Sequence, residues 1–428
     1  MVNAYMPFIN YYPNELFFTM NNCKQLQSFD VALICIFIAH DMPIVGYMFP
    51  SVLYAVLVLM VFFMLLSKIG LGGMKKIIPI FFISLLYCIV QILTTLDLVS
   101  MLQGISGFFQ LSTYTMVGYV VYQTSDLKNA KRLLFFYVLL NTITCLTTGY
   151  GCSIYPGAAR HLAVGDEAVV TDYGLYKMAN IDGFAFVYTM VLTLPIIIYW
   201  YRNVPFTRFV YKVIPIAIVL LLGYLVVQTE YTTALLLFLA LCLLFVLRQK
   251  NVSLKNCILV AILCFCTFEV FAPLLSDGLQ YMAQKTESRD MSDRLNDLSL
   301  KIIGKETESN AADLDDRGEK YMKSLDTFLS HPFGVWLASG KTGGHSYMLD
   351  NLARFGLIGL YFIWIMIKTL YVNYVAIYKR RNVYNYALFM LLGFVMLIVV
   401  NSGAFYTSLT FTLPLFLLIT ENKNTSWN

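Results

Sequence analysis

The chain has 428 residues, of which 59% are hydrophobic and only 13% are charged, and its net charge is +5. A soluble domain carries about twice that charged fraction, so this composition excludes an ordinary soluble protein. The mean hydropathy of +0.68 and the small net charge point to a membrane and give no indication of nucleic-acid binding.

Apolar runs recur along the whole chain, and each is long enough to cross a bilayer as a helix of about 20 residues. A membrane β-barrel would need alternation of period two, which the sequence lacks. We therefore predict an all-α, polytopic transmembrane helical bundle with about a dozen spans. The predicted spans are 30–48, 51–67, 77–96, 104–123, 133–149, 179–200, 213–229, 231–247, 257–275, 352–370, 384–401 and 404–420.

The first two predicted spans are separated only by Pro50, and His40 and Asp41 lie deep in the first. Ionisable residues inside a span are functional candidates by default. A proton relay and a simple hinge between two short segments are equally good interpretations of this pair.

Basic residues predict the topology, because Lys and Arg concentrate in short cytoplasmic loops. Every second short loop is basic, whereas the loops near 97–103, 228–231 and 401–404 have no Lys or Arg. Both termini are therefore expected in the cytoplasm, with outer loops at 150–178 and 276–351. The basic residues are Lys68, Lys75, Lys76, Lys128, Lys131, Arg132, Arg202, Arg208, Lys212, Arg248, Lys250, Lys255, Lys379, Arg380 and Arg381.

These loops divide the chain into three parts: spans one to nine in 1–275, the large outer loop in 276–351, and the last three spans with a short tail in 352–428. Charged residues concentrate in the large loop, where the spacing of apolar residues predicts amphipathic helices at 292–303 and 315–330. Such helices could lie at the membrane surface over a cavity, or simply cover the bundle.

The end of the large loop reads His331-Pro332-Phe333-Gly334-Val335, then Gly343-Gly344-His345-Ser346, and the next span contains Gly356-Leu357-Ile358-Gly359. This order resembles the O-antigen polymerase and ligase superfamily, which includes the Wzy-type repeat-unit polymerases. Their pattern is an Arg-led amphipathic helix, a Pro and a Gly, a His, and a span that opens Gly-Leu-Ile-Gly. In this chain Arg317 leads the helix and His345 is the motif histidine.

The resemblance implies a GT-C-like glycosyltransferase in the bacterial cytoplasmic membrane, acting at its outer face on undecaprenyl-diphosphate-linked oligosaccharide. The chain departs from the family at Glu230, which opens a span where many relatives carry a Ser-Arg pair. That arginine is thought to hold diphosphate, so another cation would replace it, and Arg160, Arg289 and Arg294 are candidates.

The expected chemistry needs cations for the leaving diphosphate and a group that accepts the proton of the acceptor hydroxyl. Arg317 would bind diphosphate and His345 would exchange the proton; a surface ion pair and a histidine that anchors the loop are the plainer alternatives. Glu230 could act as a base or pair with an arginine. Arg354 could bind substrate, snorkel, or pair with Asp350 four residues earlier.

No cluster of metal ligands stands out, so we expect a metal-independent enzyme without a cofactor. The predicted function is polymerisation of lipid-linked repeat units for a capsule, O-antigen or exopolysaccharide. A ligase of the same superfamily is the first alternative, and a flippase or secondary transporter is the second. The expected partners are the lipid-linked oligosaccharide and the bilayer, with a chain-length regulator and a flippase as candidates and no nucleic acid.

Overall fold

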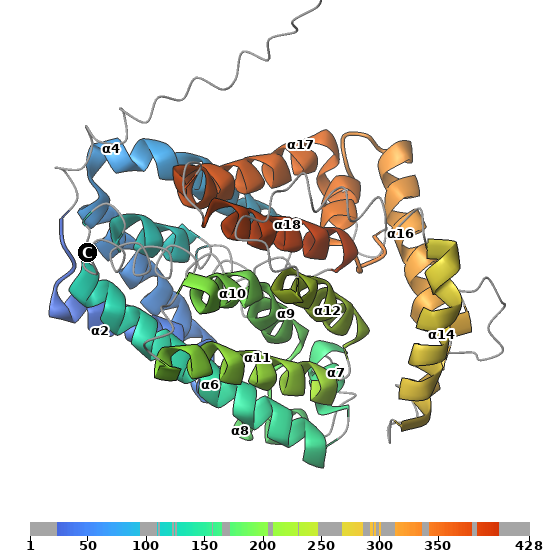
Figure 1. Cartoon of the computed structure of the whole chain (residues 1–428). Helices are drawn as coiled ribbons and strands as arrows, with labels where there is room; N and C mark the ends of the chain where they lie inside the picture. The colour runs from blue at the N-terminus through green and yellow to red at the C-terminus, as the bar shows by residue number, and fades with distance from the viewer. Residues whose placement is uncertain are drawn as a thin grey trace, which may run out of the picture. The chain divides into compact units, whose positions relative to one another are not determined.

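The fold was analysed in a computed structural model, in which every regular element of the described residues is a helix (Figure 1). The described ranges contain no strand, which confirms the all-α prediction. They are 24–94, 109, 112–121, 124, 126–155, 157–164, 172–203, 209–229, 231–246, 268–285, 292–293, 295–296, 299–300, 313–335, 342–378 and 383–401.

Within these ranges five helices are long and apolar enough to cross a membrane, which supports a multi-pass membrane protein. Three shorter apolar helices accompany them. The predicted span at 404–420, most of that at 257–275 and part of that at 104–123 lie outside the described residues. The five long helices are Ser51–Gly70, Leu127–Ile154, Phe184–Arg202, Lys212–Thr229 and Tyr347–Lys368, and the shorter ones are Ser28–Ala39, Thr233–Cys242 and Tyr384–Val400.

The chain folds into two compact units, and the first contains Met1–Asp41, Phe49–Leu140 and Thr410–Asn428. Its described part comprises α2 (Ser28–Ala39), α4 (Ser51–Thr94), the helical residues 112–121 and the start of α6 (Leu127–Ile154). Their apolar side chains form one core. Its fully buried members include Ile34, Phe37, Val58, Val61, Leu65, Tyr114, Val117 and Leu133.

One end of this unit is fixed by polar contacts. Lys68 Nζ lies 3.0 Å from the Asp30 carboxylate, and Asn129 Nδ2 donates to the Leu26 carbonyl over 2.8 Å. At the other end the prediction of a single span over 30–48 was wrong. Helix α2 ends at Ala39, and α3 (Pro43–Met48) is a separate short helix, because the polar residues after Ala39 interrupt the apolar run.

The second unit contains Met42–Met48 and Asn141–Leu409, and its central element is the pair α9–α10. This pair contacts α11, α12 and α18, so it is surrounded by helices. In its most apolar stretch of 18 residues, 67% of the residues are buried. A helix that is hydrophobic on all sides belongs in such a position. The helices of this unit are α3, α7 (Ala158–Val164), α8 (Tyr173–Met178), α9 (Phe184–Leu192), α10 (Leu194–Asn203), α11 (Phe209–Thr229), α12 (Thr232–Val246), α14 (Phe268–Lys285), α16 (Asp313–Ser330), α17 (Tyr347–Leu370) and α18 (Tyr384–Val400).

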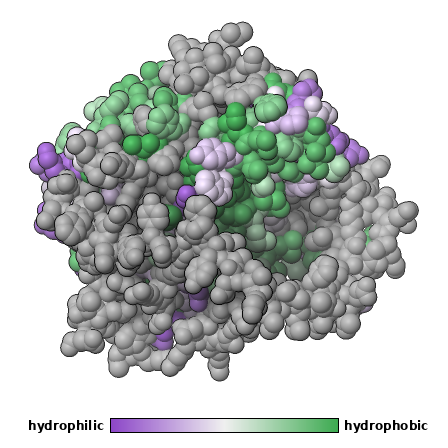
Figure 2. Space-filling view, turned by 90° about the horizontal axis from the view of Figure 1, so that it is seen from above, coloured by the Kyte–Doolittle hydropathy of each residue, from purple (hydrophilic) through white to green (hydrophobic). Residues whose placement is uncertain are grey.

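The membrane-length helices of both units expose large apolar side chains, as a lipid environment requires. Phe63, Phe135 and Leu220 are 61%, 71% and 69% exposed. On the face shown in Figure 2, hydrophobic residues occupy most of the coloured surface, and hydrophilic residues occur in small groups.

Helix α17 is broken at Gly356, whose φ of 60° and ψ of −143° are not helical. The break places Gly359 so close to the first segment that a Cβ there would lie 2.3 Å from the Asn351 carbonyl oxygen. The span predicted at 352–370 therefore coincides with a membrane-length helix, Tyr347–Lys368, but that helix is kinked at Gly356. Tyr347–Phe355 is a short separate helix, and the second segment starts at Leu357 and continues through a π-helical turn to Tyr378.

The turn that follows α16 replaces the helical hydrogen bond that the break removes. In a continuous α-helix the Leu357 amide would donate to the Ala353 carbonyl. Here Leu357 N donates to Pro332 O over 3.1 Å, and Val335 N donates to Ala353 O over 3.1 Å. The turn at 332–335 thus bonds both orphaned groups of α17, and Pro332 ends α16 as the sequence predicts.

Substituting Gly356 by alanine should lower the free energy of unfolding by roughly 2–4 kcal/mol. The residue has positive φ, and an added Cβ would lie 2.1 Å from the Pro332 carbonyl oxygen. Thermal unfolding of the detergent-solubilised protein measures this effect. The matched control is Gly278→Ala on α14, where an added Cβ meets nothing within 4 Å. Equal melting temperatures for the two variants would contradict the conclusion that the fold requires the backbone break at Gly356.

Candidate functional site

Helix α16 confirms the amphipathic helix predicted at 315–330, with one difference in its buried face. Ser324 is fully buried and Tyr321 is half-buried, but Met322 and Leu329 are 53% and 64% exposed. The apolar periodicity therefore predicted the helix correctly but did not identify which residues are covered.

Ser324 joins α16 to the glycine-rich segment that precedes α17. Its hydroxyl donates to Asp350 Oδ1 over 2.7 Å and accepts from Gly343 N over 2.8 Å. The Gly344 amide also donates to Asp350 Oδ1, over 3.1 Å. A Cβ on Gly343 would lie 2.0 Å from the Lys320 carbonyl oxygen, so this segment approaches the helix backbone as closely as only glycine allows.

This attachment places His345 beside a lysine of α16. Lys320 Nζ lies 2.9 Å from His345 Nε2, and both residues come from the large predicted outer loop. An ammonium group has only donors, so Nε2 accepts the hydrogen bond and the neutral imidazole carries its proton on Nδ1. The contact thus combines a positive charge with an imidazole nitrogen that accepts a hydrogen bond.

The segment from His345 onward is also fixed to the end of α18. Ser346 caps α17, because its Oγ accepts from Leu349 N over 3.1 Å. Tyr347 N donates to Asn401 O, and Tyr321 OH donates to Val400 O, each over 2.8 Å. Three elements distant in sequence therefore converge on one short stretch of backbone.

A second group of contacts involves the smaller predicted outer loop. Tyr231 OH donates to the Ala159 carbonyl of α7 over 2.5 Å, and the rings of Tyr231 and Tyr188 lie 6.2 Å apart. Tyr188 OH contacts Asn401 Oδ1 at 3.5 Å. Tyr188 and Asn401 therefore connect α7 to the same end of α18 that holds Tyr347.

Asn180 organises the approach to α9. It has a positive φ of 57°, its Oδ1 accepts from Ile44 N over 3.2 Å, and its Nδ2 donates to Thr147 Oγ1 over 2.9 Å. Just ahead of α9, burial raises the pKa of the Asp182 carboxyl, while Lys177 and the Gly183 amide lower it. These contacts fix the chain just ahead of α9.

The structure describes the side chains of only two of the seven predicted site residues. His345 lies beside Lys320, and Arg354 is exposed on α17. The alternative in which Arg354 pairs with Asp350 was wrong, because Asp350 bonds Ser324 and Gly344 instead.

The other five residues are placed less completely. Arg317 lies on α16 and Arg160 on α7, but their side chains fall outside what the structure describes. Glu230, Arg289 and Arg294 lie outside the described residues altogether.

The sequence did not predict that Lys320 contacts His345, that Ser324 bonds Asp350, or that the Gly344 amide donates to Asp350. One signal was available for Lys320, which follows Arg317 by three residues and therefore lies on the same side of the helix. No sequence signal links Ser324 to Gly343, since their contact depends on how the turn at 332–335 folds back.

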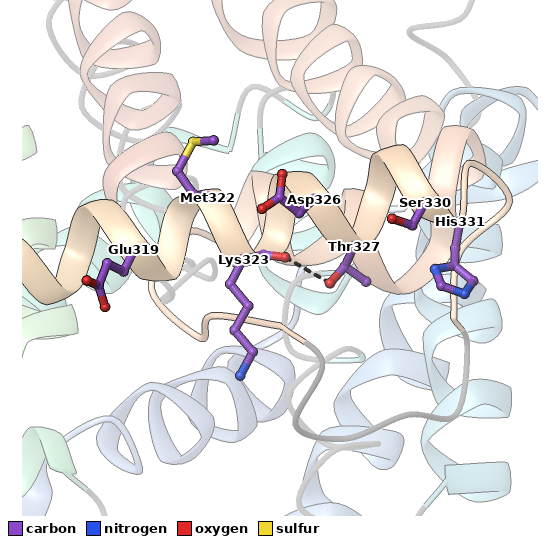
Figure 3. A pocket seen from close by; sticks show the side chains of 7 residues that line it. All are labelled: Glu319, Met322, Lys323, Asp326, Thr327, Ser330 and His331. Carbon is purple, nitrogen blue, oxygen red and sulfur yellow. Dashed lines mark hydrogen bonds between the residues drawn. The ribbon is translucent and has the colours of Figure 1, made fainter.

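The opposite side of α16 borders a shallow pocket of about 550 Å³ (Figure 3). Its lining carries both signs of charge and is open to solvent. In the described part of the chain, no three His, Cys, Asp or Glu side chains are grouped closely enough to hold a metal ion. The lining residues are Glu319, Met322, Lys323, Asp326, Thr327, Ser330 and His331.

Comparison with known proteins adds no identification. No protein-family profile matches the sequence, and no curated protein matches it. The resemblance to the O-antigen polymerase and ligase superfamily stays a prediction.

Replacing Ser324 by alanine should release the segment that carries His345. The change leaves the Gly343 amide without its acceptor and costs about 1–3 kcal/mol. Hydrogen–deuterium exchange of a peptide covering 342–350 should then speed up by roughly tenfold or more. Ser330→Ala, an exposed serine on the same helix, is the control. Unchanged exchange in the Ser324 variant would show that this bond does not hold the segment.

Proposed function

We propose that this protein is a membrane glycosyltransferase that polymerises undecaprenyl-diphosphate-linked repeat units at the outer face of a bacterial cytoplasmic membrane. The proposal includes a GT-C-like bundle of about a dozen spans. The observation that carries it is the 2.9 Å contact between Lys320 and His345, at the start of the broken helix α17. It brings a cation and a proton acceptor together in the segment whose residues resemble the polymerase family.

Lys320 supplies the cation that the sequence lacks near Glu230. A lysine ammonium binds phosphate as a point charge, and a guanidinium adds two parallel hydrogen bonds. Arg317 precedes Lys320 by three residues on α16, so both belong to one side of the helix. In our proposal these two residues bind the diphosphate, and Arg160, Arg289, Arg294 and Arg354 are further candidates.

The proposed reaction transfers a glycan to a sugar hydroxyl of a second lipid-linked unit. The acceptor oxygen forms a bond to the anomeric carbon of the donor as the bond from that carbon to the diphosphate oxygen breaks. The diphosphate leaves with the electron pair, and Lys320 and Arg317 stabilise its negative charge. Once Lys320 turns to the diphosphate, His345 Nε2 is able to accept the proton of the attacking hydroxyl.

Substituting Lys320 by methionine or His345 by alanine should abolish polymer and leave single repeat units on the lipid carrier. Losing a positioned cation or proton acceptor lowers such rates by roughly 10²-fold or more. Assays with purified protein and lipid-linked repeat units measure the polymer formed. Arg317→Ala is expected to behave in the same way.

Lys323→Met is the matched control, because it removes the same charge from the exposed side of the same helix. It should polymerise normally. Wild-type amounts of polymer in both the Lys320 and His345 variants would remove the proposed site. Long polymer that remains on the lipid carrier and is not transferred would instead identify a ligase.

The proposal also requires that α16 faces the outside of the cell. Ser330→Cys, at the exposed end of α16, should react with a membrane-impermeant maleimide in intact cells. Ser67→Cys, exposed near the predicted cytoplasmic end of the second span, should react only after the cells are permeabilised. The reverse pattern would exclude sugar transfer at the outer face by this segment.

A further inference from the structure

The exposed side of α16 carries two parallel rows of residues with different chemistry. One row is apolar, and the other has the same spacing shifted by one residue, so the rows lie about 100° apart around the helix. The second row is charged or polar at every position. The apolar row is Gly318, Met322, Leu325 and Leu329, and the polar row is Glu319, Lys323, Asp326 and Ser330.

Both rows reach the surface of the second unit. Met322 and Leu329 are 53% and 64% exposed, and Phe333, in the turn after α16, is 76% exposed. All four residues of the polar row line the open pocket, and in Figure 3 the side chains of Met322 and Lys323 extend to opposite sides of the helix. The exposed apolar residues thus form a strip along one edge of the polar row.

The apolar strip leads to the surface of α17. Leu357 N donates to Pro332 O over 3.1 Å, and a Cβ on Gly356 would lie 2.6 Å from the carbonyl carbon of Phe333. Phe333 therefore lies beside the start of the second segment of α17. The first two residues of that segment, Leu357 and Ile358, are 54% and 42% exposed.

The character of α17 changes at the same point. Its first segment contains Asp350 and the exposed Arg354, whereas residues 357–367 include no charged residue. This uncharged stretch belongs to a helix that is long and apolar enough to cross a membrane. A cation just ahead of an apolar stretch suits the boundary between water and lipid, where its long side chain can reach the headgroups. The turn at 332–335 is therefore bonded to α17 at the level where its surface becomes apolar.

We propose that α16 is an interfacial helix, which docks on the lipid surface through Met322, Leu325, Leu329 and Phe333. An amphipathic helix of this kind buries its apolar side at the boundary between headgroups and acyl chains and keeps its polar side in water. The bilayer is the occupant because the apolar strip continues into the exposed apolar surface of α17. The polar row has two anions and one cation, so the docking rests on apolar contact and needs no anionic lipid.

This docking does not depend on the proposed polymerisation. It concerns the exposed side of α16, whereas the half-buried Lys320 contacts His345 on the covered side. Docking would fix the height of Lys320 relative to the membrane surface, whatever reaction the protein catalyses. A measurement of lipid contact therefore tests it separately from any assay of polymer.

Single cysteines at two neighbouring positions test the proposal, Leu329→Cys in the apolar row and Ser330→Cys in the polar row. The full-length variants are placed in phosphatidylcholine nanodiscs, where both faces are accessible, and labelled with an environment-sensitive maleimide fluorophore. Labelled wild type gives the signal of the nine native cysteines, which is subtracted. The ratio of quenching by a nitroxide-labelled lipid to quenching by iodide in water should be several-fold higher for Leu329→Cys than for Ser330→Cys.

Equal ratios at the two positions would overturn the proposal. A label at position 329 that is protected from both quenchers would also overturn it, because a protein surface would then cover the apolar row. Met322→Cys and Lys323→Cys form a second matched pair one turn and a half earlier on α16, and all four positions are exposed, so the changes leave the packed side of the helix intact. The same several-fold difference is expected for this pair, and equal ratios there would exclude docking along the helix.

Discussion

The second unit depends on the crossing of two backbone segments at Gly356. The turn at 332–335 passes so close to α17 that its peptide groups take over the hydrogen bonds of the broken helix. Buried peptide groups must be bonded, above all in a membrane where water is absent. The crossing satisfies this requirement and at the same time changes the direction of the chain ahead of the apolar segment that begins at Leu357.

This crossing explains why a polar site can form at the head of an apolar helix. With the turn fixed against α17, α16 runs back over the glycine-rich segment, and Ser324 bonds both Gly343 and Asp350. Lys320 then reaches His345. The contacts of Ser324 thus bring the Lys320 ammonium and the His345 imidazole together, which is the arrangement from which our proposed function is argued.

The two units place their ionisable residues in different surroundings. In the second unit Lys320 and His345 come from a polar segment and contact each other. In the first unit Asp41 accepts a hydrogen bond from the buried Tyr114 hydroxyl. Burying a carboxyl group is costly, and here the hydrogen bond from the Tyr114 hydroxyl offsets part of that cost.

The sequence by itself determined the helical class, most of the helices and the amphipathic character of α16, because apolar runs and their period act locally. It also predicted His345 as a candidate site residue, and it showed the glycines that precede and interrupt α17. Only the tertiary structure decided that α17 breaks at Gly356, that the first predicted span is interrupted after Ala39, and that Lys320 is the partner of His345. These features depend on contacts between segments far apart in the chain, and local residue patterns carry no information about which backbone segment crosses which.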